Sequence, residues 1–270
     1  MPQWAGSCWY YLRFVDPLNE DHSWSKEAES YWMPVDLYVG GVEHAVLHLL
    51  YARFWHHVLH DLGLVSTREP FQKLFNQGMI QGEDGQKMSK SRGNVVNPDD
   101  VVQEYGADSF RLYEMFMGPL EKSKPWSSTG LQGCYRFIQK IWKLLTEDPS
   151  KIQENCATDE TIKLLHQSIK KVTEDLTALR FNTSVSQLMI FVNHLIILEN
   201  LDKSVLHQFL LILNPFAPHL SEELNEMLGF ETLAKSSWPE YDPELIIEET
   251  ITIAVQFNGK TRGNISILKE

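Results

Sequence analysis

The chain has 270 residues, of which 43% are hydrophobic and 22% are charged, and a formal net charge of −12; these values exclude a disordered tail and confine any nucleic-acid affinity to local basic patches. Its three cysteines, an odd number without C-x-x-C spacing, exclude a disulfide framework and a cysteine-rich zinc site and indicate reduced thiols in a cytoplasmic setting. The first residues lack the features of a signal peptide and no apolar run approaches the ~20 residues that a membrane span needs, so the sequence predicts a soluble protein without a membrane partner.

The first region, through residue 125, mixes glycines, aromatic segments and short strands with single helices, as α/β proteins do. Apolar residues at steps of three and four predict a helix over residues 42–62 that ends at Gly63. Residues 74–81 are predicted to form a strand. The polar, glycine-rich sequence GEDGQKMSKSRGN that follows is predicted to be an exposed, mobile loop. Asn97-Pro98 then starts the next helix.

The second region has sustained helical periodicity and predicts an antiparallel helical bundle with short connections. Its predicted helices cover residues 135–146, 159–179, 182–198, 203–213 and 219–228. In the third region, residues 250–268 alternate apolar and polar side chains around Asn258-Gly259, which predicts a β-hairpin. Because a single hairpin is marginally stable by itself, we expect this last unit to be cut short.

Two groups of titratable residues have ordinary structural interpretations. His56, His57 and His60 lie on different faces of one predicted helix, so we expect solvated or helix-terminal histidines and no metal site. The acidic residues Glu222, Glu223 and Glu226 follow Pro218-His219 at a predicted helix start, where carboxylates favour the positive end of the helix dipole.

Lys87 and Lys90 lie three residues apart on the predicted loop. Two ammonium groups on a flexible loop can close over a polyphosphate and neutralise the charge that builds on its leaving group when an α-phosphate is attacked. Contacts made only in the transition state accelerate the reaction, which is why the loop is expected to move. The alternative is an ordinary solvated basic loop.

KMSKS, followed by RGNVVNPDDVVQEYGADSFRLYEMF, resembles the signature loop of class I aminoacyl-tRNA synthetases. Other segments resemble the leucyl-tRNA synthetases in particular and are spread over almost the whole chain. They are WAGSCWYYLR at 4–13, YVGGVEHAVLHLLYARFWH at 38–56, FNQGMI at 75–80, NPFAPHLSEEL at 214–224 and VQFNGKTRG at 255–263.

The resemblance implies ATP-dependent activation of leucine, with Mg2+ accompanying ATP, followed by transfer to tRNA(Leu). It also implies three domains: the second half of a Rossmann-like catalytic domain with the KMSKS loop at residues 1–125, an anticodon-binding-type helical domain at 126–240, and the truncated start of a small α+β domain at 241–270. Basic side chains of the helical region either contact tRNA phosphates or form a solvated face. They are Arg136, Lys140, Lys143, Lys170, Lys171 and Arg180.

The resemblance also implies the site residues. Lys87 and Lys90 would stabilise charge on the departing pyrophosphate, and the backbone of Met79 and Ile80 would read the adenine edge. The implied ATP site comprises Gly40, Gly41, Glu43, His48, Met79, Ile80, Lys87, Met88, Ser89, Lys90 and Ser91. The implied leucine pocket comprises Trp4, Ser7, Tyr10 and His44, although the aromatic residues of this segment would ordinarily form part of a core.

The family's H-x-G-H signature, its amino-group carboxylate and its editing domain are absent from this sequence. We therefore expect that the chain needs a missing N-terminal half or subunit and is inactive alone. It is either the second subunit of a split synthetase or a fragment of a longer chain. The alternative function is a noncatalytic tRNA-binding module, and an isoleucyl or valyl enzyme is disfavoured by the segments around Trp4 and His44.

Overall fold

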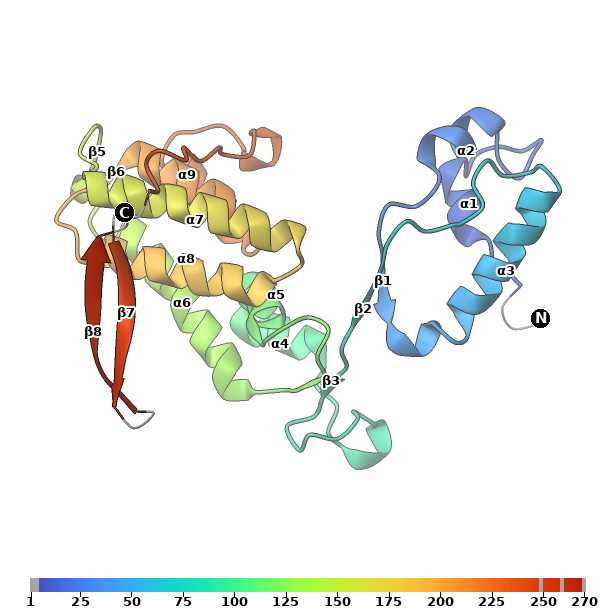
Figure 1. Cartoon of the computed structure of the whole chain (residues 1–270), viewed down its shortest axis with the longest axis horizontal. Coiled ribbons are helices and arrows are strands. Elements are labelled where there is room, and N and C mark those ends of the chain that lie inside the picture. Colours follow the sequence, from blue (N-terminus) through green and yellow to red (C-terminus); the bar gives the residue numbers. More distant parts are fainter. Residues whose placement is uncertain (1–4, 248–249, 258–259, 269–270) are drawn as a thin grey trace. The chain divides into compact units, whose positions relative to one another are not determined.

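The computed structural model describes residues 5–247, 250–257 and 260–268 (Figure 1). The chain forms two compact units. The first unit contains residues 1–96 and 119–126, and the second contains residues 97–118 and 127–270. The chain therefore leaves the first unit after Val96, forms two helices of the second, and returns at Pro119.

The first unit contains a parallel β–α–β arrangement in which β1 (Tyr38–Gly41) pairs with β2 (Leu74–Gln77) and α3 (His48–Asp61) lies between them in the sequence. The smaller helices α1 (Tyr10–Val15) and α2 (Lys26–Trp32) precede it. A second parallel pair joins β3 (Ile80–Gln81) to β4 (Lys124–Pro125). These strand pairs agree with the α/β pattern of the sequence, although the strands are shorter than expected.

The helix predicted over residues 42–62 begins later than expected. Residues Val42–His44 form a 3-10 turn, and α3 starts at His48 because Leu47 has a non-helical backbone (φ −119°, ψ −95°). Val42 and Val46 are 63% and 72% exposed, so these two side chains belong to an exposed apolar surface. They do not form part of a buried helix face. The predicted stop is confirmed, since Gly63 has φ +70° and donates to the His60 carbonyl.

The strand predicted over residues 74–81 is interrupted at Gly78, between β2 and β3. The Gly78 N–H donates to the Leu120 carbonyl (2.8 Å), and a Cβ on Gly78 would overlap the backbone of Lys122 and Ser123. The glycine therefore lets the returning segment 119–126 lie directly against the chain, and the strand changes its partner from β1 to β4.

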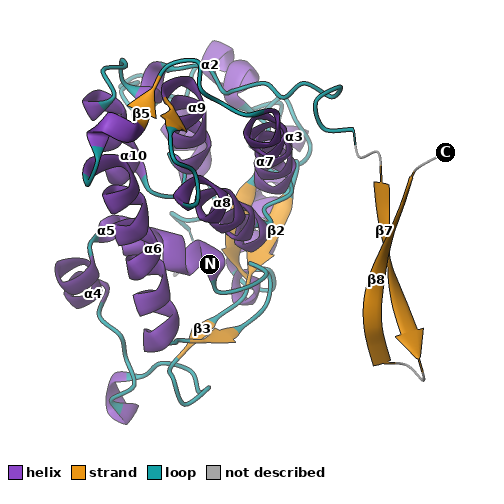
Figure 2. Ribbon diagram, turned by 90° about the vertical axis from the view of Figure 1, so that its left-hand side faces the viewer, coloured by secondary structure: helices purple, strands orange, loops and turns teal. Residues whose placement is uncertain are grey.

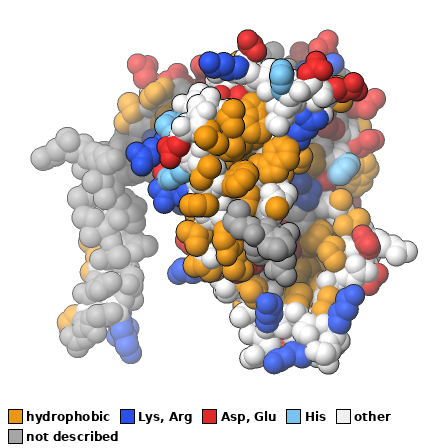
Figure 3. Space-filling model, turned by 90° about the vertical axis from the view of Figure 1, so that its right-hand side faces the viewer, with side chains coloured by type: hydrophobic (Ala, Val, Ile, Leu, Met, Phe, Trp, Pro, Cys, Tyr) orange, Lys and Arg blue, Asp and Glu red, His pale blue; other side chains and the backbone are white. Residues whose placement is uncertain are grey.

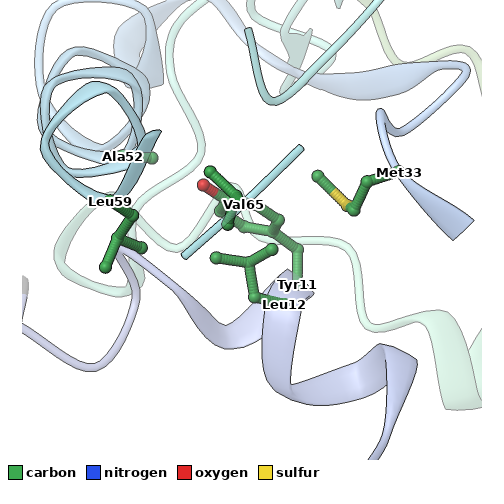
Figure 4. Close-up of a cluster of buried hydrophobic side chains, with 6 residues drawn as sticks. All are labelled: Tyr11, Leu12, Met33, Ala52, Leu59 and Val65. Carbon is green, nitrogen blue, oxygen red and sulfur yellow. The ribbon is translucent and has the colours of Figure 1, made fainter. Parts of the chain in front are cut away.

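The core of the first unit lies between α1, α2 and α3 (Figure 4). It contains the buried side chains of Tyr11, Leu12, Met33, Ala52, Leu59 and Val65. Trp9 and Tyr10 pack against this cluster, so the aromatic segment at the start of the chain contributes to the core as one of its two interpretations predicted.

The expectation of solvated or helix-terminal histidines is wrong for His56, which is fully buried (0% exposed). Its Nδ1 lies 3.0 Å from the Tyr11 hydroxyl and its Nε2 lies 2.9 Å from the Thr67 carbonyl. Because a carbonyl only accepts, Nε2 carries the proton of the neutral ring and Nδ1 accepts from Tyr11. Burial lowers the pKa of His56. His57 instead pairs with Glu69 (3.2 Å) near the surface.

We expect the stability of the chain to fall when the pH drops below the ordinary histidine pKa of 6.5. The unfolded chain then binds a proton at His56 that the native chain binds only at lower pH, so stability is complete above 6.5 and is lost as the pH falls through the native pKa. Urea unfolding should show this loss approaching about 1.4 kcal/mol per pH unit. His56→Gln should flatten the profile and the control His57→Gln should not; an unchanged profile for His56→Gln would contradict the assignment.

The second unit is built from seven described α-helices (Figure 2). They are α4 (Pro98–Tyr105), α5 (Ala107–Phe116), α6 (Ser128–Thr146), α7 (Asp159–Thr177), α8 (Phe181–Ile196), α9 (Lys203–Leu213) and α10 (Pro218–Met227). Short segments β5 (Ile152–Gln153) and β6 (Leu201–Asp202) pair in parallel. None of the helices in the described part of the chain is long and apolar enough to span a bilayer.

The predicted helices of the second unit are confirmed within two residues, except for the start of α6. That helix begins at Ser128 and not at 135, because the Ser127 hydroxyl accepts from the Gly130 N–H (3.1 Å) and caps it. The predicted cap of α4 is confirmed, since the Asn97 side chain accepts from the Asp99 N–H. The predicted hairpin is also confirmed.

The hairpin pairs β7 (Thr250–Phe257) with β8 (Lys260–Leu268) in an antiparallel register that places Ile253 opposite Ile265. The residues predicted to form its turn, Asn258 and Gly259, lie outside the described residues.

The N-terminus of α10 is capped from a distant helix and not by the acidic residues that follow it. Asp108 of α5 accepts from the Leu220 N–H (2.7 Å) and lies 2.8 Å from His219 Nδ1. Glu222 instead accepts from the Leu233 and Ala234 N–H groups (3.0 and 2.9 Å). The dipole interpretation of the acidic stretch is therefore wrong for Glu222, whose carboxylate holds the following loop.

We expect Asp108→Ala to destabilise the second unit by about 1–2 kcal/mol, because the buried carboxylate is the cap of α10. Glu223→Ala, which removes an exposed carboxylate of α10 itself, is the matched control and should change little. Thermal unfolding followed by circular dichroism would measure both. Equal effects of the two substitutions would contradict the capping role.

Candidate functional site

The KMSKS loop, residues 82–94, leaves the end of β3, and most of its residues after Gly82 are exposed, as predicted. The side chains of Lys87 and Lys90 are exposed, whereas Met88 and Ser89 are half-buried. Residues Lys90–Arg92 form a 3-10 turn that ends at Gly93, whose φ is +69°. The Ser89 and Ser91 hydroxyls lie 2.8 Å apart. The loop thus presents both ammonium groups to solvent while its serines bond to each other.

Hydrogen bonds between the side chains of Asp84 and Asn94 join the two ends of the loop. Both carboxylate oxygens of Asp84 accept from Asn94 Nδ2 (3.1 and 3.2 Å), and Asn94 Oδ1 accepts from the Ser89 N–H (2.9 Å). We call this pair the Asp84–Asn94 clasp. Neither residue was singled out by the sequence analysis.

The two glycines predicted to approach ATP lie at the end of β1. A Cβ on Gly41 would lie 2.5 Å from both carboxylate oxygens of Glu43, so the Glu43 side chain folds back over this glycine. A Cβ on Gly40 would lie 3.1 Å from the Tyr38 ring. Glu43 itself is exposed, which leaves its carboxylate accessible to hydroxyl donors.

Four rings gather beside the start of α3 and form what we call the aromatic cluster: Tyr10, Tyr38, His44 and His48. The His48 ring centroid lies 5.9 Å from that of Tyr10, 6.2 Å from Tyr38 and 6.4 Å from His44. Burial and a hydrogen bond with Tyr38 raise the pKa of Tyr10 to about 12, and burial next to His44 lowers the pKa of His48. Tyr10 and His48 are therefore neutral near pH 7.

The aromatic cluster joins residues predicted for two different ligands. Tyr10 and His44 were predicted to bind leucine, and His48 was predicted to line the ATP site. Tyr38 was missed, although its position two residues before Gly40 on a strand places both on one face. Ser7 lies half-buried in the turn before α1, and Trp4 lies outside the described residues.

The backbone groups predicted to read adenine differ in their availability. The Met79 N–H donates to Ser123 Oγ (3.2 Å) and its carbonyl accepts from the Lys124 N–H (3.0 Å). The Gln81 carbonyl likewise accepts from Trp126 (2.8 Å). Because successive residues of a strand point to opposite edges, the backbone groups of Ile80 face away from β4. They face the edge of β3 where Gln81 bridges Lys87 of the loop.

Most of the basic side chains considered for tRNA contacts bond within the protein. Lys171 and Arg180 both bind the fully buried Asp175 (2.6 and 2.9 Å). Lys140 donates to Asn193 (2.8 Å), Lys143 lies 3.8 Å from Glu147, and Lys170 lies over the Tyr241 ring at 5.8 Å. Within the described residues, histidine, cysteine and acidic side chains form no group of three that could hold a metal ion.

An exposed apolar surface runs along α3 and the residues before it, and Figure 3 shows hydrophobic side chains gathered on one face. We call it the α3 apolar face. Its members are each more than 40% exposed and are Val39, Val42, Val46, Leu47, Leu50 and Phe54. Exposed apolar patches mark protein–protein or membrane contact surfaces or ligand-binding grooves.

Comparison with known proteins identifies the family. The model described as tRNA synthetases class I (I, L, M and V) matches residues 17–125, and that of the anticodon-binding domain of tRNA ligase matches residues 160–270. The leucine–tRNA ligase of Chlorobium phaeobacteroides (strain BS1) is 53% identical over 270 residues, 98% of this chain and 34% of the relative. That of Pelodictyon phaeoclathratiforme (strain DSM 5477 / BU-1) is 55% identical over 97% of this chain and 33% of its own length.

The chain belongs to the leucyl-tRNA synthetase family. The resemblance recognised from its motifs is therefore confirmed, and the chain spans about a third of the length of the curated relatives it matches. It combines a class I synthetase catalytic fragment with an anticodon-binding domain and is mostly helical with short strands.

Solved structures agree with this family. The leucyl-tRNA synthetase of Agrobacterium radiobacter K84, crystallised as a ternary complex with tRNA and LeuAMS, matches with a TM-score of 0.84 and 34% identity over 97% of this chain and 36% of that protein. The methionyl-tRNA synthetase of Mycobacterium tuberculosis matches with a TM-score of 0.63 and 16% identity over 84% of this chain and 50% of that protein, a likeness in fold alone.

We expect Gly78→Ala to disrupt the base of the KMSKS loop, because the added methyl group would overlap the backbone of Lys122 and Ser123. A shift of the backbone there should cost at least about 1–3 kcal/mol of stability. Gly133→Ala in α6 is the control, since a Cβ there has open space around it and should be tolerated. Chemical unfolding of both variants measures this, and a neutral Gly78→Ala would contradict the close approach.

Proposed function

We propose that this chain forms part of a leucine–tRNA ligase, which activates leucine with ATP and transfers it to tRNA(Leu). The observation that carries the proposal is the exposure of both Lys87 and Lys90 on a loop that starts at β3. Family membership supports the same reaction.

In the first step, a carboxylate oxygen of leucine attacks the α-phosphate of ATP, and pyrophosphate leaves. Lys87 and Lys90 stabilise the negative charge on the departing pyrophosphate, together with Mg2+ that enters as part of the MgATP substrate. In the second step, a ribose hydroxyl at the tRNA 3′ end attacks the leucyl carbonyl, and AMP leaves. Only contacts that strengthen in the transition state accelerate the first step, which suits side chains that are solvated before ATP binds.

The remaining residues divide between ATP and leucine. Gly40, Gly41 and Glu43 border the ribose, and adenine is read at Met79 and Ile80 chiefly through the backbone of Ile80, because both backbone groups of Met79 bond to the segment that contains β4. The loop residues Met88, Ser89 and Ser91 complete the phosphate side. Tyr10 and His44, with Ser7 and Trp4, bind leucine, and Tyr38 and His48 join them through the aromatic cluster.

The neutrality of Tyr10 and His48 supports a leucine pocket, because an apolar side chain is bound best where no charge needs hydration. Such a pocket separates amino acids that differ by one methylene by only ~1–3 kcal/mol.

The α3 apolar face and the short parallel strands support a further part of the proposal. We assign residues 1–125 to the second half of a Rossmann-like domain whose other half covers this face. Residues 126–240 form the antiparallel anticodon-binding-type domain, and residues 241–270 begin the small C-terminal domain. Leucine activation then requires the missing N-terminal half of the synthetase, and the chain alone is inactive.

We expect Lys90→Ala and Lys87→Ala, introduced into the complete synthetase, to lower the rate of leucine-dependent pyrophosphate exchange about 100-fold or more each, because each removes a cation that stabilises the leaving group. Affinity for tRNA(Leu) should not change. Lys73→Ala, an exposed lysine outside the loop, is the control. Unchanged exchange with weakened tRNA binding would instead support a noncatalytic tRNA-binding module.

A further inference from the structure

The KMSKS loop is held in one shape by hydrogen bonds that do not involve its lysine side chains. Asn94 reaches the backbone on both sides of Met88: its Oδ1 accepts from the Ser89 N–H (2.9 Å) and its Nδ2 approaches the Lys87 carbonyl (3.4 Å). Its Nδ2 also donates to both oxygens of Asp84 (3.1 and 3.2 Å). One amide thus connects the start of the loop to the segment that carries the lysines.

The charge of Asp84 sets the orientation of this amide. An ionised carboxylate only accepts hydrogen bonds, so the NH2 group of Asn94 must face Asp84 and its carbonyl oxygen must face Ser89. Asp84 Oδ1 also accepts from the Gln86 N–H (3.0 Å), and the hydrogen bonds from Gln86 and Asn94 lower the pKa of Asp84. The carboxylate is therefore charged, and the amide has one favourable orientation at neutral pH.

The side chains of the Asp84–Asn94 clasp fit against the backbone because residue 82 is a glycine. A Cβ on the buried Gly82 would lie 2.7 Å from Asp84 Oδ1 and 2.8 Å from Asn94 Nδ2, so both polar groups rest on this glycine. The Gly82 N–H donates to the Gln86 carbonyl (2.9 Å) and the Gly85 N–H to the Gly82 carbonyl (2.9 Å). With φ +69° at Gly85, these bonds form the tight turn that brings Lys87 back beside Gln81.

We propose that the Asp84–Asn94 clasp is the positioning device of the KMSKS loop: it fixes the backbone at Lys87 and Ser89 so that the two lysine side chains are presented to ATP without a large loss of loop entropy on binding. This inference rests on the proposed function and deepens it. Asp84 and Asn94 are positioning residues that act through Lys87 and Lys90. A loop ordered beforehand loses less conformational entropy when its cations meet the polyphosphate.

The chemistry of the pair offers a reciprocal exchange as a test. Asp84→Asn removes the charge that orients the amide, and Asn94→Asp places two carboxylates against each other. The double variant D84N/N94D restores one amide and one carboxylate: Asn at 84 donates to Asp at 94, which still accepts from the Ser89 N–H. Gln86→Ala is the matched control, because this exposed residue contributes its backbone N–H and carbonyl, which the substitution keeps.

The first measurement reads the loop itself and needs no activity. In this chain, trypsin should cleave after Lys87, Lys90 and Arg92 about tenfold faster in Asn94→Asp and Asp84→Asn, because cleavage follows the population of the open loop. The double variant and Gln86→Ala should keep the original rate. Unchanged cleavage in both single variants, or no recovery in the double variant, would overturn the clasp.

The second measurement reads pyrophosphate exchange in the complete synthetase. Each single variant should lower kcat about 10- to 100-fold with the KM for leucine unchanged, and the double variant should recover most of it. A loop that opens to trypsin while exchange stays normal would overturn the positioning role. If Lys90→Ala leaves exchange unaffected, the proposed function fails separately, whatever the trypsin result.

Discussion

The close approach of the returning segment 119–126 to Gly78 determines how the site of the first unit is built. The Gly78 N–H donates to the Leu120 carbonyl, and the absence of a side chain lets the two backbones meet. Strand β3 can then pair with β4, and this pairing fixes the start of the KMSKS loop. The same contact occupies the backbone of Met79 and leaves that of Ile80 facing the other edge. A residue without a side chain therefore determines which backbone groups of this segment pair with residues 120–126.

Buried polar side chains connect segments that are distant in the sequence in both units. Glu29, 2% exposed, accepts from the Ser66 N–H and hydroxyl (2.9 and 3.0 Å), and His56 joins Tyr11 to Thr67. Asp108 holds the start of α10, whereas Asp175 makes short-range bonds to Lys171 and Arg180. Each of these groups would be costly to bury without its partner, so each specifies one arrangement of the loops around it.

The sequence predicts well those features that depend on neighbouring residues. Helical periodicity locates α7 to α10, the Asn97-Pro98 pair locates the start of α4, and alternation locates the hairpin. It also predicts the exposure of Lys87 and Lys90. The starts of α3 and α6 are missed for local reasons, at Leu47 and Ser127, whereas the other failures depend on partners farther along the chain. Leu120 interrupts the strand at Gly78, Tyr11 and Thr67 bury His56, and Asp108 caps a helix 112 residues away. The role of Tyr38 likewise becomes visible only once α1 and α3 bring Tyr10 and His48 beside it.

Residues 97–118 belong to the second unit but lie in the sequence between two segments of the first unit, which limits how the chain can be divided. The peptide chain passes between the units three times, after Val96, after Gly118 and after Trp126. No single cleavage can therefore release one unit from the other. A recombinant piece ending near residue 125 would remove α5 from α6 and α8, the helices on which it packs. Dissection of this molecule into soluble halves would have to follow its contacts and not a linear boundary.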